Sequence, residues 1–448
     1  MPTPLLALLA LPALPQDVPK MWLLKDAKVV VRPGTVLEHA SILIKDGKIA
    51  AVGDVPAPQG AEVIDCAGLT AYAGLIHPFL RTSIAGVSSA APAGAPGQRP
   101  AQSASDLAAA QKKRDADPFN REGNLLAKPT KDLKQADVSA FESLAKSGYT
   151  LAQVSATGGL LGTAGAVYGL GTKNIDPSGV VSTPDFVPIS LAGRGGFGGG
   201  YPSSTMGVIA FIRQSLFDAQ RYNRLAEKPK DAELATLAPA ATGKTSVVFD
   251  DLNEVSFFQA ANLTKEFGLQ PVYVFRSDAG AVMDLLKNGT VMLKGAIPPK
   301  PSVGSNLETA SLRGVRTYFN ELQAAVELEK NGIPFVYAPA DTSSPLEGIR
   351  MYVRGGLGRD AALAALTTRP ASLLGLKDAG TLEQGNLGNV VLTQGDILDS
   401  KSQIMATFVQ GKRVDFKMPD RAKEITADGI VTVMKPNYGL FPLPAETT

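Results

Sequence analysis

Residues 73–81 read AGLIHPFLR, an apolar strand pattern whose end carries two polar residues, His77 and Arg81. The Gly-Leu-Ile segment is typical of a buried strand, and it follows a Gly-rich β pattern. The chain contains only one other histidine, His39. Any chemistry at the end of this strand therefore has very few imidazole groups available.

Short alternating β patterns flank this strand from both ends of the chain. They span 22–31, 41–53 and 61–68 on the N-terminal side, and 388–396 and 402–414 on the C-terminal side. Asp46-Gly47 between two of them is a strong signal for a two-residue hairpin turn. The sequence therefore predicts a small β-sandwich domain built from both chain ends, residues 20–72 and 379–420. A middle domain over 73–378 is inserted in it.

The middle of the chain alternates short apolar runs with amphipathic helical patterns. The runs have the composition of buried parallel strands and span 150–155, 246–250, 271–275, 290–293 and 334–339. Helical patterns fill the gaps over 206–226, 254–267, 279–287 and 308–330. In the last helix the apolar positions are Leu312, Val315, Phe319, Leu322 and Val326. Repeated β-α units on this scale predict an α/β fold with a TIM-type (β/α)8 barrel.

Composition indicates a globular protein without a bias toward polyanionic partners. Of 448 residues, 44% are apolar and 19% are charged, which suits a substantial buried core. Lys and Arg number 44 against 42 Asp and Glu, so the formal net charge is only +2. A nucleic-acid or anionic-membrane surface needs clustered cations, so we expect neither partner. Cys66 is the only cysteine, which excludes an intrachain disulfide and a cysteine metal cluster.

The first residues predict export. An apolar run extends from Leu5 to Leu14, is interrupted by Pro12, and precedes a small-residue region. The run is too short to span a bilayer and is similar to the apolar core of a secretory signal. No Lys or Arg precedes it, so a disordered apolar tail is the alternative. We expect a signal peptide at 1–19, an exported chain (periplasmic or extracellular), and a C-terminal tail at 421–448.

Several segments, in order along the chain, resemble the amidohydrolase superfamily and specifically its imidazolonepropionase-like branch. They are GKIAAVG (47–53), AEVIDCAGLTAYAGLIHP (61–78), YPSSTMGVIAFIRQSLFDAQRY (201–222), LGRDAALAALTTRPASLLGL (357–376), GTLEQGNLGNVVLTQGDIL (380–398) and ATFVQGKRV (406–414). Agreement between segments from both ends and the middle makes the resemblance strong as a statement about fold. It implies a barrel with a small β domain, hydrolysis of carbon–nitrogen bonds other than peptide bonds, and zinc or another divalent metal.

The metal ligands implied by that resemblance do not recur here. Relatives use a His-x-His pair after the first barrel strand, a residue from the fourth, histidines after the fifth and sixth, and an Asp after the eighth. The matching positions hold Phe79 and Arg81, then Asp250 and Asp251, then Arg276, Ser277 and Asp278, and finally Asp341. His77 stands where relatives have an Asp just before their histidine pair. A hydrolytic zinc site needs several imidazoles, so we expect no bound metal or other cofactor.

Asp341 and His77 are the candidate catalytic residues. In an active relative, Asp341 would bind the metal and take a proton from metal-bound water. Without the metal that water keeps its ordinary pKa, and an inherited Asp paired with Arg276 or Arg81 is the alternative. His77 is compatible with an acid–base group at the barrel mouth and with a structural histidine, since no nucleophile accompanies it.

Arg81, Arg276, Asp278 and Lys294 are the candidate ligand-binding residues, because they lie at or just after predicted strand ends. Fixed cations there would replace the charge of a metal and bind a carboxylate or another anion. Internal salt bridges to neighbouring Asp residues are the alternative. Binding of Ca²⁺ or Mg²⁺ through carboxylate oxygens is a further alternative.

Three hypotheses for function follow. The first is an amidohydrolase-like pseudoenzyme with a degenerate metal site, which binds a small-molecule or anionic ligand or acts as an interaction partner. The second is a working hydrolase of carbon–nitrogen (non-peptide) bonds with a non-standard site. The third is a structural subunit, which forms a homo-oligomer or pairs with an active relative. The first starts from the observation that Phe79 and Arg81 stand where ligands are implied.

Overall fold

The computed structural model describes residues 21–82, 138–157, 160–162, 165–170, 179–183, 186–192, 202, 204–298 and 312–414. The expected signal peptide at 1–19 and the expected tail at 421–448 lie outside these ranges. Within them, no helix combines the length and the apolar character that crossing a bilayer requires. Strands and helices both contribute along the described chain, so the expected α/β class is confirmed.

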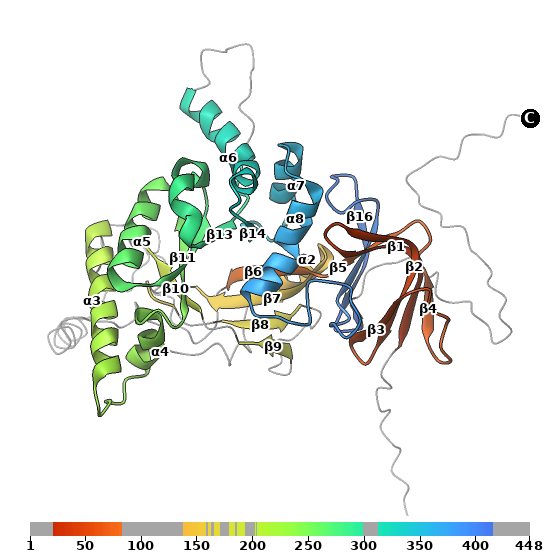
Figure 1. Cartoon of the computed structure of the whole chain (residues 1–448), viewed down its shortest axis with the longest axis horizontal. Coiled ribbons are helices and arrows are strands. Elements are labelled where there is room, and N and C mark those ends of the chain that lie inside the picture. Colours follow the sequence, from red (N-terminus) through yellow and green to blue (C-terminus); the bar gives the residue numbers. More distant parts are fainter. Residues whose placement is uncertain are drawn as a thin grey trace, which may run out of the picture.

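One eight-stranded sheet takes its strands from both ends of the described chain (Figure 1). The strands are β1 (Trp22–Arg32), β2 (Thr35–Lys45), β3 (Lys48–Gly53), β4 (Glu62–Asp65), β5 (Thr70–Ala73), β15 (Val390–Gln394), β16 (Gln403–Val409) and β17 (Lys412–Val414). Their order is β17-β16-β15-β5-β1-β2-β3, with β4 paired to β1. Antiparallel pairing sets Val390 of β15 opposite Ala73 of β5. The two chain ends therefore share a sheet, while the sandwich arrangement and the domain limits stay predictions.

The turn between β2 and β3 has the backbone that its sequence predicts. Asp46 and Gly47 have φ angles of 50° and 76°, and a two-residue turn of type I′ needs positive φ at both positions. A Cβ atom added to Gly47 would lie 3.0 Å from the carbonyl oxygen of Gln410. Glycine therefore permits both the turn and the close approach of the C-terminal strands.

Trp22, the only tryptophan of the chain, lies where the two chain ends meet. Its side chain is buried, and its ring meets Phe408 of β16 edge-on with centroids 5.5 Å apart. Its Nε1–H donates a hydrogen bond to the carbonyl oxygen of Gly411 at 3.0 Å. The indole therefore connects β1 to β16 and to the turn that follows it.

We expect Phe408→Leu to lower the free energy of unfolding by about 1 kcal/mol, because the smaller side chain leaves a gap beside Trp22. The fluorescence emission of Trp22 should change in the folded state, since the ring contact is lost. Phe267→Leu is the control, because Phe267 packs on Phe217 with centroids 4.8 Å apart and does not touch the indole. Equal changes of emission in both variants would contradict the contact.

Two further sheets carry the strands of the middle region. The parallel five-stranded sheet has the order β10-β11-β12-β13-β14, formed by β10 (Phe186–Ser190), β11 (Ser246–Leu252), β12 (Gln270–Phe275), β13 (Thr290–Leu293) and β14 (Phe335–Tyr337). The four-stranded sheet has the order β6-β7-β8-β9, formed by β6 (Leu75–Thr82), β7 (Tyr149–Ala156), β8 (Ala166–Gly169) and β9 (Val180–Ser182). β6 and β7 are parallel, whereas β8 and β9 are antiparallel additions.

The antiparallel strands depart from the regular β-α repeat expected of this region. The connection between Ala156 and Ala166 is shorter than the dozen or so residues that a parallel crossover needs, so β8 returns antiparallel. In the described residues no strand pairing joins β14 to β6, so closure into a TIM-type barrel stays a prediction.

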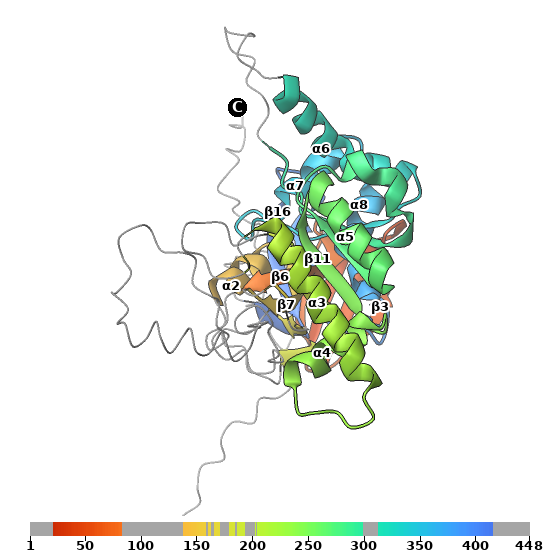
Figure 2. The ribbon, with the colours of Figure 1, turned by 90° about the vertical axis from the view of Figure 1, so that its left-hand side faces the viewer.

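Helices alternate with the parallel strands. They are α2 (Val138–Lys146), α3 (Thr205–Arg224), α4 (Ala232–Ala241), α5 (Glu254–Phe267), the 3₁₀ segment η3 (Ala279–Asn288), α6 (Leu312–Lys330), α7 (Glu347–Arg354), α8 (Arg359–Leu366) and α9 (Thr368–Leu373). Asn253 and Ser256 form a capping box at the start of α5, and Gly268 ends it with a φ of 65°. The helix expected over 254–267 is thereby confirmed. Figure 2 shows α5 alongside β11, and α3 lies next to α5.

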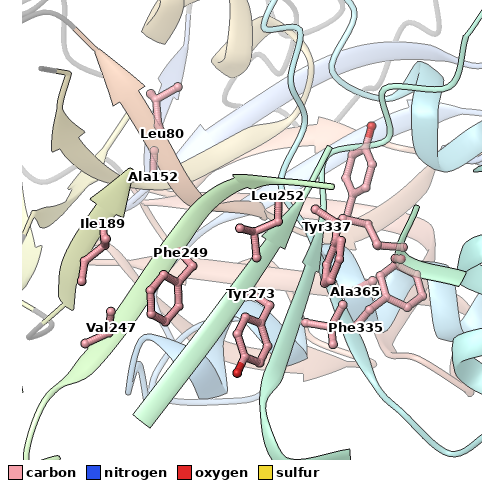
Figure 3. Packing of buried hydrophobic residues seen from close by; sticks show 14 of the residues in the cluster. Leu80, Ala152, Ile189, Val247, Phe249, Leu252, Tyr273, Phe335, Tyr337 and Ala365 are labelled. Atoms are coloured by element: carbon pink, nitrogen blue, oxygen red, sulfur yellow. The ribbon is translucent and has the colours of Figure 1, made fainter. Parts of the chain in front are cut away.

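Both faces of the central strands are buried. One cluster combines side chains from the two sheets: Ile76, Leu151, Val167, Phe186, Val248, Val272, Met292 and Val336. The opposite face contributes Val247, Phe249 and Tyr273 to a larger cluster (Figure 3), where Tyr273 meets Phe257 of α5 with centroids 5.0 Å apart. Burial on both faces is typical of parallel strands. The strands that end in polar residues are therefore well packed on both faces.

Candidate functional site

Three cations and two carboxylates form one ion network at the carboxyl ends of four strands. Arg81 lies in β6, Asp250 and Asp251 in β11, Arg276 directly after β12, and Lys294 directly after β13. Lys294 Nζ lies 2.8 Å from Asp250 Oδ1 and 3.0 Å from Asp251 Oδ1. Arg81 Nη1 lies 3.4 Å from Asp250 Oδ2, and Arg276 Nε lies 2.8 Å from Asp251 Oδ1. Three of the four predicted ligand-binding residues are thus joined through Asp250 and Asp251.

A backbone irregularity at the end of β11 places both carboxylates beside Lys294. The register with β12 shifts between Phe249 and Leu252, and Asp251 has a left-handed φ of 61°. In a regular strand the side chains of Asp250 and Asp251 would point to opposite faces of the sheet. Asp is among the residues that enter the left-handed region most readily. The local backbone conformation therefore builds the network.

The network is mostly shielded from water. The side chains of Asp250, Arg81 and Lys294 are 12%, 18% and 19% exposed, whereas that of Arg276 is 65% exposed. Burial acts to raise the pKa of Asp251, but the hydrogen bonds and charges of Arg276 and Lys294 hold that pKa below its usual value. The contact between Lys294 and Asp250 is an ion pair whose angles fall outside hydrogen-bond geometry. Among the described residues of the network, cations exceed carboxylates by one, which gives this set a net positive charge.

The two positions that the resemblance assigns to a His-x-His pair have different surroundings. Phe79 is buried among the apolar residues shared by the two sheets. Arg81 reaches the network, and its Nη2 also donates to the carbonyl oxygen of Ala156 at 3.2 Å. The guanidinium lies 6.0 Å from the centroid of the Phe79 ring. One ligand position is therefore part of the core, and the other holds a cation.

His77 is buried within strand β6. It is 1% exposed, and its Nδ1 accepts a hydrogen bond from the backbone N–H of Phe79 at 3.3 Å. Nε2 has no hydrogen-bond partner in the described part of the chain. Burial lowers the pKa of His77 to about 4, with a further lowering by Lys294 and an opposing effect of the Pro339 carbonyl. The imidazole is therefore neutral near pH 7. Its burial favours the structural alternative.

Asp341 follows β14 and is exposed. Its Oδ1 accepts hydrogen bonds from the N–H of Ser343 at 2.8 Å and from the Ser343 hydroxyl at 2.7 Å. These bonds lower the pKa of Asp341. Asp341 and Lys294 line the same cleft of about 350 Å³. The described part of the chain shows no ion pair between Asp341 and Arg276 or Arg81, whose guanidinium groups bind the carboxylates of β11.

Asp278 is directed toward α6 rather than into the ion network. Its backbone N–H donates to Glu321 Oε1 at 2.5 Å, and its Oδ2 accepts from the Ser277 hydroxyl at 2.9 Å. Glu321 is 5% exposed, and burial raises its pKa to about 7 despite the Asp278 N–H. Sequence reasoning missed Glu321. The available signal was its spacing of four and seven residues before Ala325 and Leu328, both buried.

The residues present do not fit a histidine-held divalent metal. No group of three His, Cys, Asp or Glu side chains with metal-binding geometry occurs among the described residues. Asp250 and Asp251 are already neutralised by cations, and Asp341 accepts hydrogen bonds from its own loop. A divalent ion at these carboxylates would have to take the place of the Lys294 ammonium, whose positive charge repels it. The same argument weakens the alternative of Ca²⁺ or Mg²⁺ bound through oxygen ligands.

Comparisons with known proteins establish the fold. No family model matches the chain. A segment of 54 residues is 50% identical to hydroxydechloroatrazine ethylaminohydrolase from Pseudomonas sp. (strain ADP), and the match spans 10% of this chain and 11% of that protein. Among solved structures, an amidohydrolase from Thermotoga maritima MSB8 is similar with a TM-score of 0.65 and 18% identity over 88% of this chain and 99% of that one. A prolidase complexed with N-methylphosphonate-L-proline is similar with a TM-score of 0.51 and 13% identity over 88% and 99%. The chain therefore has an amidohydrolase-type fold, while the imidazolonepropionase-like branch stays a prediction.

Proposed function

We propose that this chain binds a small molecule with an anionic group in the cleft beside Lys294 and does not hydrolyse it with a histidine-held metal. The proposed scaffold is a TIM-type barrel that the antiparallel strands β8 and β9 interrupt. The observation that carries the proposal is the ion network, in which Lys294 bridges Asp250 and Asp251 where the fold would place metal ligands.

Among the described residues that line it, the cleft offers one fixed cation and a mixed wall. Lys294 donates one hydrogen bond to Asp251 and forms an ion pair with Asp250, so N–H donors of its ammonium remain for a ligand. The other lining residues include the apolar side chains of Ile297 and Met351 and the carboxylates of Asp341 and Glu347. A carboxylate on the ligand would meet the Lys294 ammonium, and an apolar part would contact Met351.

The second candidate function is hydrolysis of a carbon–nitrogen bond other than a peptide bond. The local match to an ethylaminohydrolase and the amidohydrolase-type fold favour it. The proton acceptor in that case would be Asp341. The hydrogen bonds from Ser343 keep its pKa low, so the carboxylate is a weak base for an ordinary water molecule.

A binding and turnover experiment separates the two candidates. We expect succinate to raise the melting temperature in a saturable way at constant ionic strength. Met351→Trp should abolish this rise by filling the cleft, and Met206→Trp on α3 should retain it, because Met206 is 82% exposed and outside the cleft. We also expect no turnover of hydantoin, with or without added Zn²⁺. Hydantoin turnover that Asp341→Asn abolishes, together with stoichiometric zinc, would establish the hydrolase and overturn the first proposal.

A further inference from the structure

A second cleft, here called the arginine cleft, lies between α7, the start of α8 and the segment that follows β15. Its volume is about 470 Å³. Four of its lining residues are cations, Arg350, Arg354, Arg359 and Lys401, and one lining residue is a carboxylate, Asp399. The cleft beside Lys294 is lined by other residues of α7, including Glu347 and Met351. The two clefts are therefore separate sites that share a helix.

The arginine side chains are held in fixed positions. Arg359 Nη1 lies 2.5 Å from Asp396 Oδ2, and its Nη2 lies 2.5 Å from Asp399 Oδ1. Arg350 donates from Nε and Nη2 to the carbonyl oxygen of Ile397 at 3.1 and 2.9 Å. The backbone of the segment after β15 therefore orients one guanidinium, and its carboxylates orient another.

Arg350 and Lys401 are the two lining cations for which the described part of the chain shows no ion pair. By contrast, Arg354 pairs with Glu347 and Arg359 pairs with two Asp residues. Two of the five N–H donors of Arg350 bond to a neutral carbonyl group, so others remain for a ligand. Burial lowers the pKa of Arg350 by withdrawing its charge from water, while the nearby carboxylates of Glu347 and Asp399 act to raise it. A bound anion would compensate that loss of hydration.

We propose that the arginine cleft binds a small molecule through an oxyanion group, with phosphate as the preferred group. Planar guanidinium forks match the oxygen spacing of phosphate and carboxylate groups, and several forks together suit the higher charge of phosphate. The volume exceeds that of a single phosphate and lies in the range of small-molecule sites. The ligand class is therefore a phosphate-bearing small molecule rather than a free inorganic ion. Arg350 and Arg359 would position the phosphate, and Arg354 and Lys401 at the exposed rim would add charge.

Calorimetric titration of the whole chain with pyrophosphate, at constant ionic strength, tests the proposal. We expect saturable binding, about tenfold weaker in the double variant Arg354→Gln, Lys401→Gln, because two charged contacts are lost at the rim. The matched control is Arg213→Gln, which breaks an exposed helical ion pair with Glu266 outside the cleft and should leave the affinity unchanged.

Succinate forms the second arm of the titration and distinguishes carboxylate from phosphate. Absence of saturable pyrophosphate binding would overturn the proposal, and so would an equal loss of affinity in the double variant and in Arg213→Gln. If succinate binds, the double variant weakens that binding and pyrophosphate does not bind, the assignment to phosphate is overturned. Met351→Trp should leave pyrophosphate binding intact, so a failure of the proposed function and a failure of this inference are distinguishable.

Discussion

Lys294→Met should lower the free energy of unfolding by about 3 kcal/mol, because it removes the cation that joins two shielded carboxylates. The Lys294 ammonium lies within 3.0 Å of both Asp250 and Asp251, and its side chain is only 19% exposed. After the substitution, Asp250 retains Arg81 at 3.4 Å, and Asp251 retains Arg276 at 2.8 Å. These longer or more exposed contacts do not replace a central ammonium, so two carboxylates would repel each other across the site.

Chemical denaturation at neutral pH measures this cost. Lys330→Met is the matched control, because Lys330 pairs with Glu327 at 2.8 Å on an exposed helix surface, with 64% of the lysine side chain exposed. That variant should change stability by less than about 1 kcal/mol. A similar small effect for Lys294→Met would mean that the network contributes little and that its residues are free to rearrange around a ligand or a metal ion.

The ion network shows which part of the site the sequence was able to predict. Parallel strands bring their carboxyl ends to one edge, so residues just after successive strands are expected to be neighbours. That reasoning placed Arg81, Arg276 and Lys294 together, and ion pairs to the β11 carboxylates join all three. It did not predict the register shift in β11, because a single positive-φ Asp leaves no periodic signal in the sequence.

The direction of His77 was not predictable for a similar reason. Strand β6 is apolar on both faces, so no alternation indicates which residues point inward. A histidine between Ile76 and Pro78 is then as compatible with the strand interior as with the barrel mouth. The structure puts it in the interior, where an ionised imidazole is disfavoured.

Helix α6 follows the predicted apolar spacing only in part. The apolar spacing predicts that Leu312 and Phe319 are buried, but they are 65% and 54% exposed. The buried positions include Val326 of that spacing, and also Glu321, Ala324, Ala325 and Leu328, which lie outside it. Small residues carry little hydrophobic signal, so Ala325 and its neighbours were outweighed in the pattern by larger side chains on the solvent side.

Two buried groups, His77 and Glu321, should give opposite pH dependences of stability. The pKa of His77 falls from 6.5 to about 4 on folding, so between these values the unfolded chain binds more protons and stability decreases as pH falls. The pKa of Glu321 rises from 4.5 to about 7, so between these values the folded chain binds more protons and stability decreases as pH rises. Each effect is on the order of 3 kcal/mol over its full range. In the unmodified chain the two slopes largely cancel between pH 4.5 and pH 6.5.

Single substitutions should therefore reveal slopes that the unmodified chain conceals. Glu321→Gln leaves the His77 effect, so its free energy of unfolding should fall as pH is lowered from 6.5 toward 4. His77→Phe leaves the Glu321 effect, so its free energy of unfolding should fall as pH is raised from 4.5 toward 7. His39→Gln is the control, because His39 is a surface residue with 87% of its side chain exposed, and it should keep the flat profile. Denaturation curves across this pH range measure all four proteins, and slopes of the same sign in the two buried-site variants would contradict the assignment of these groups.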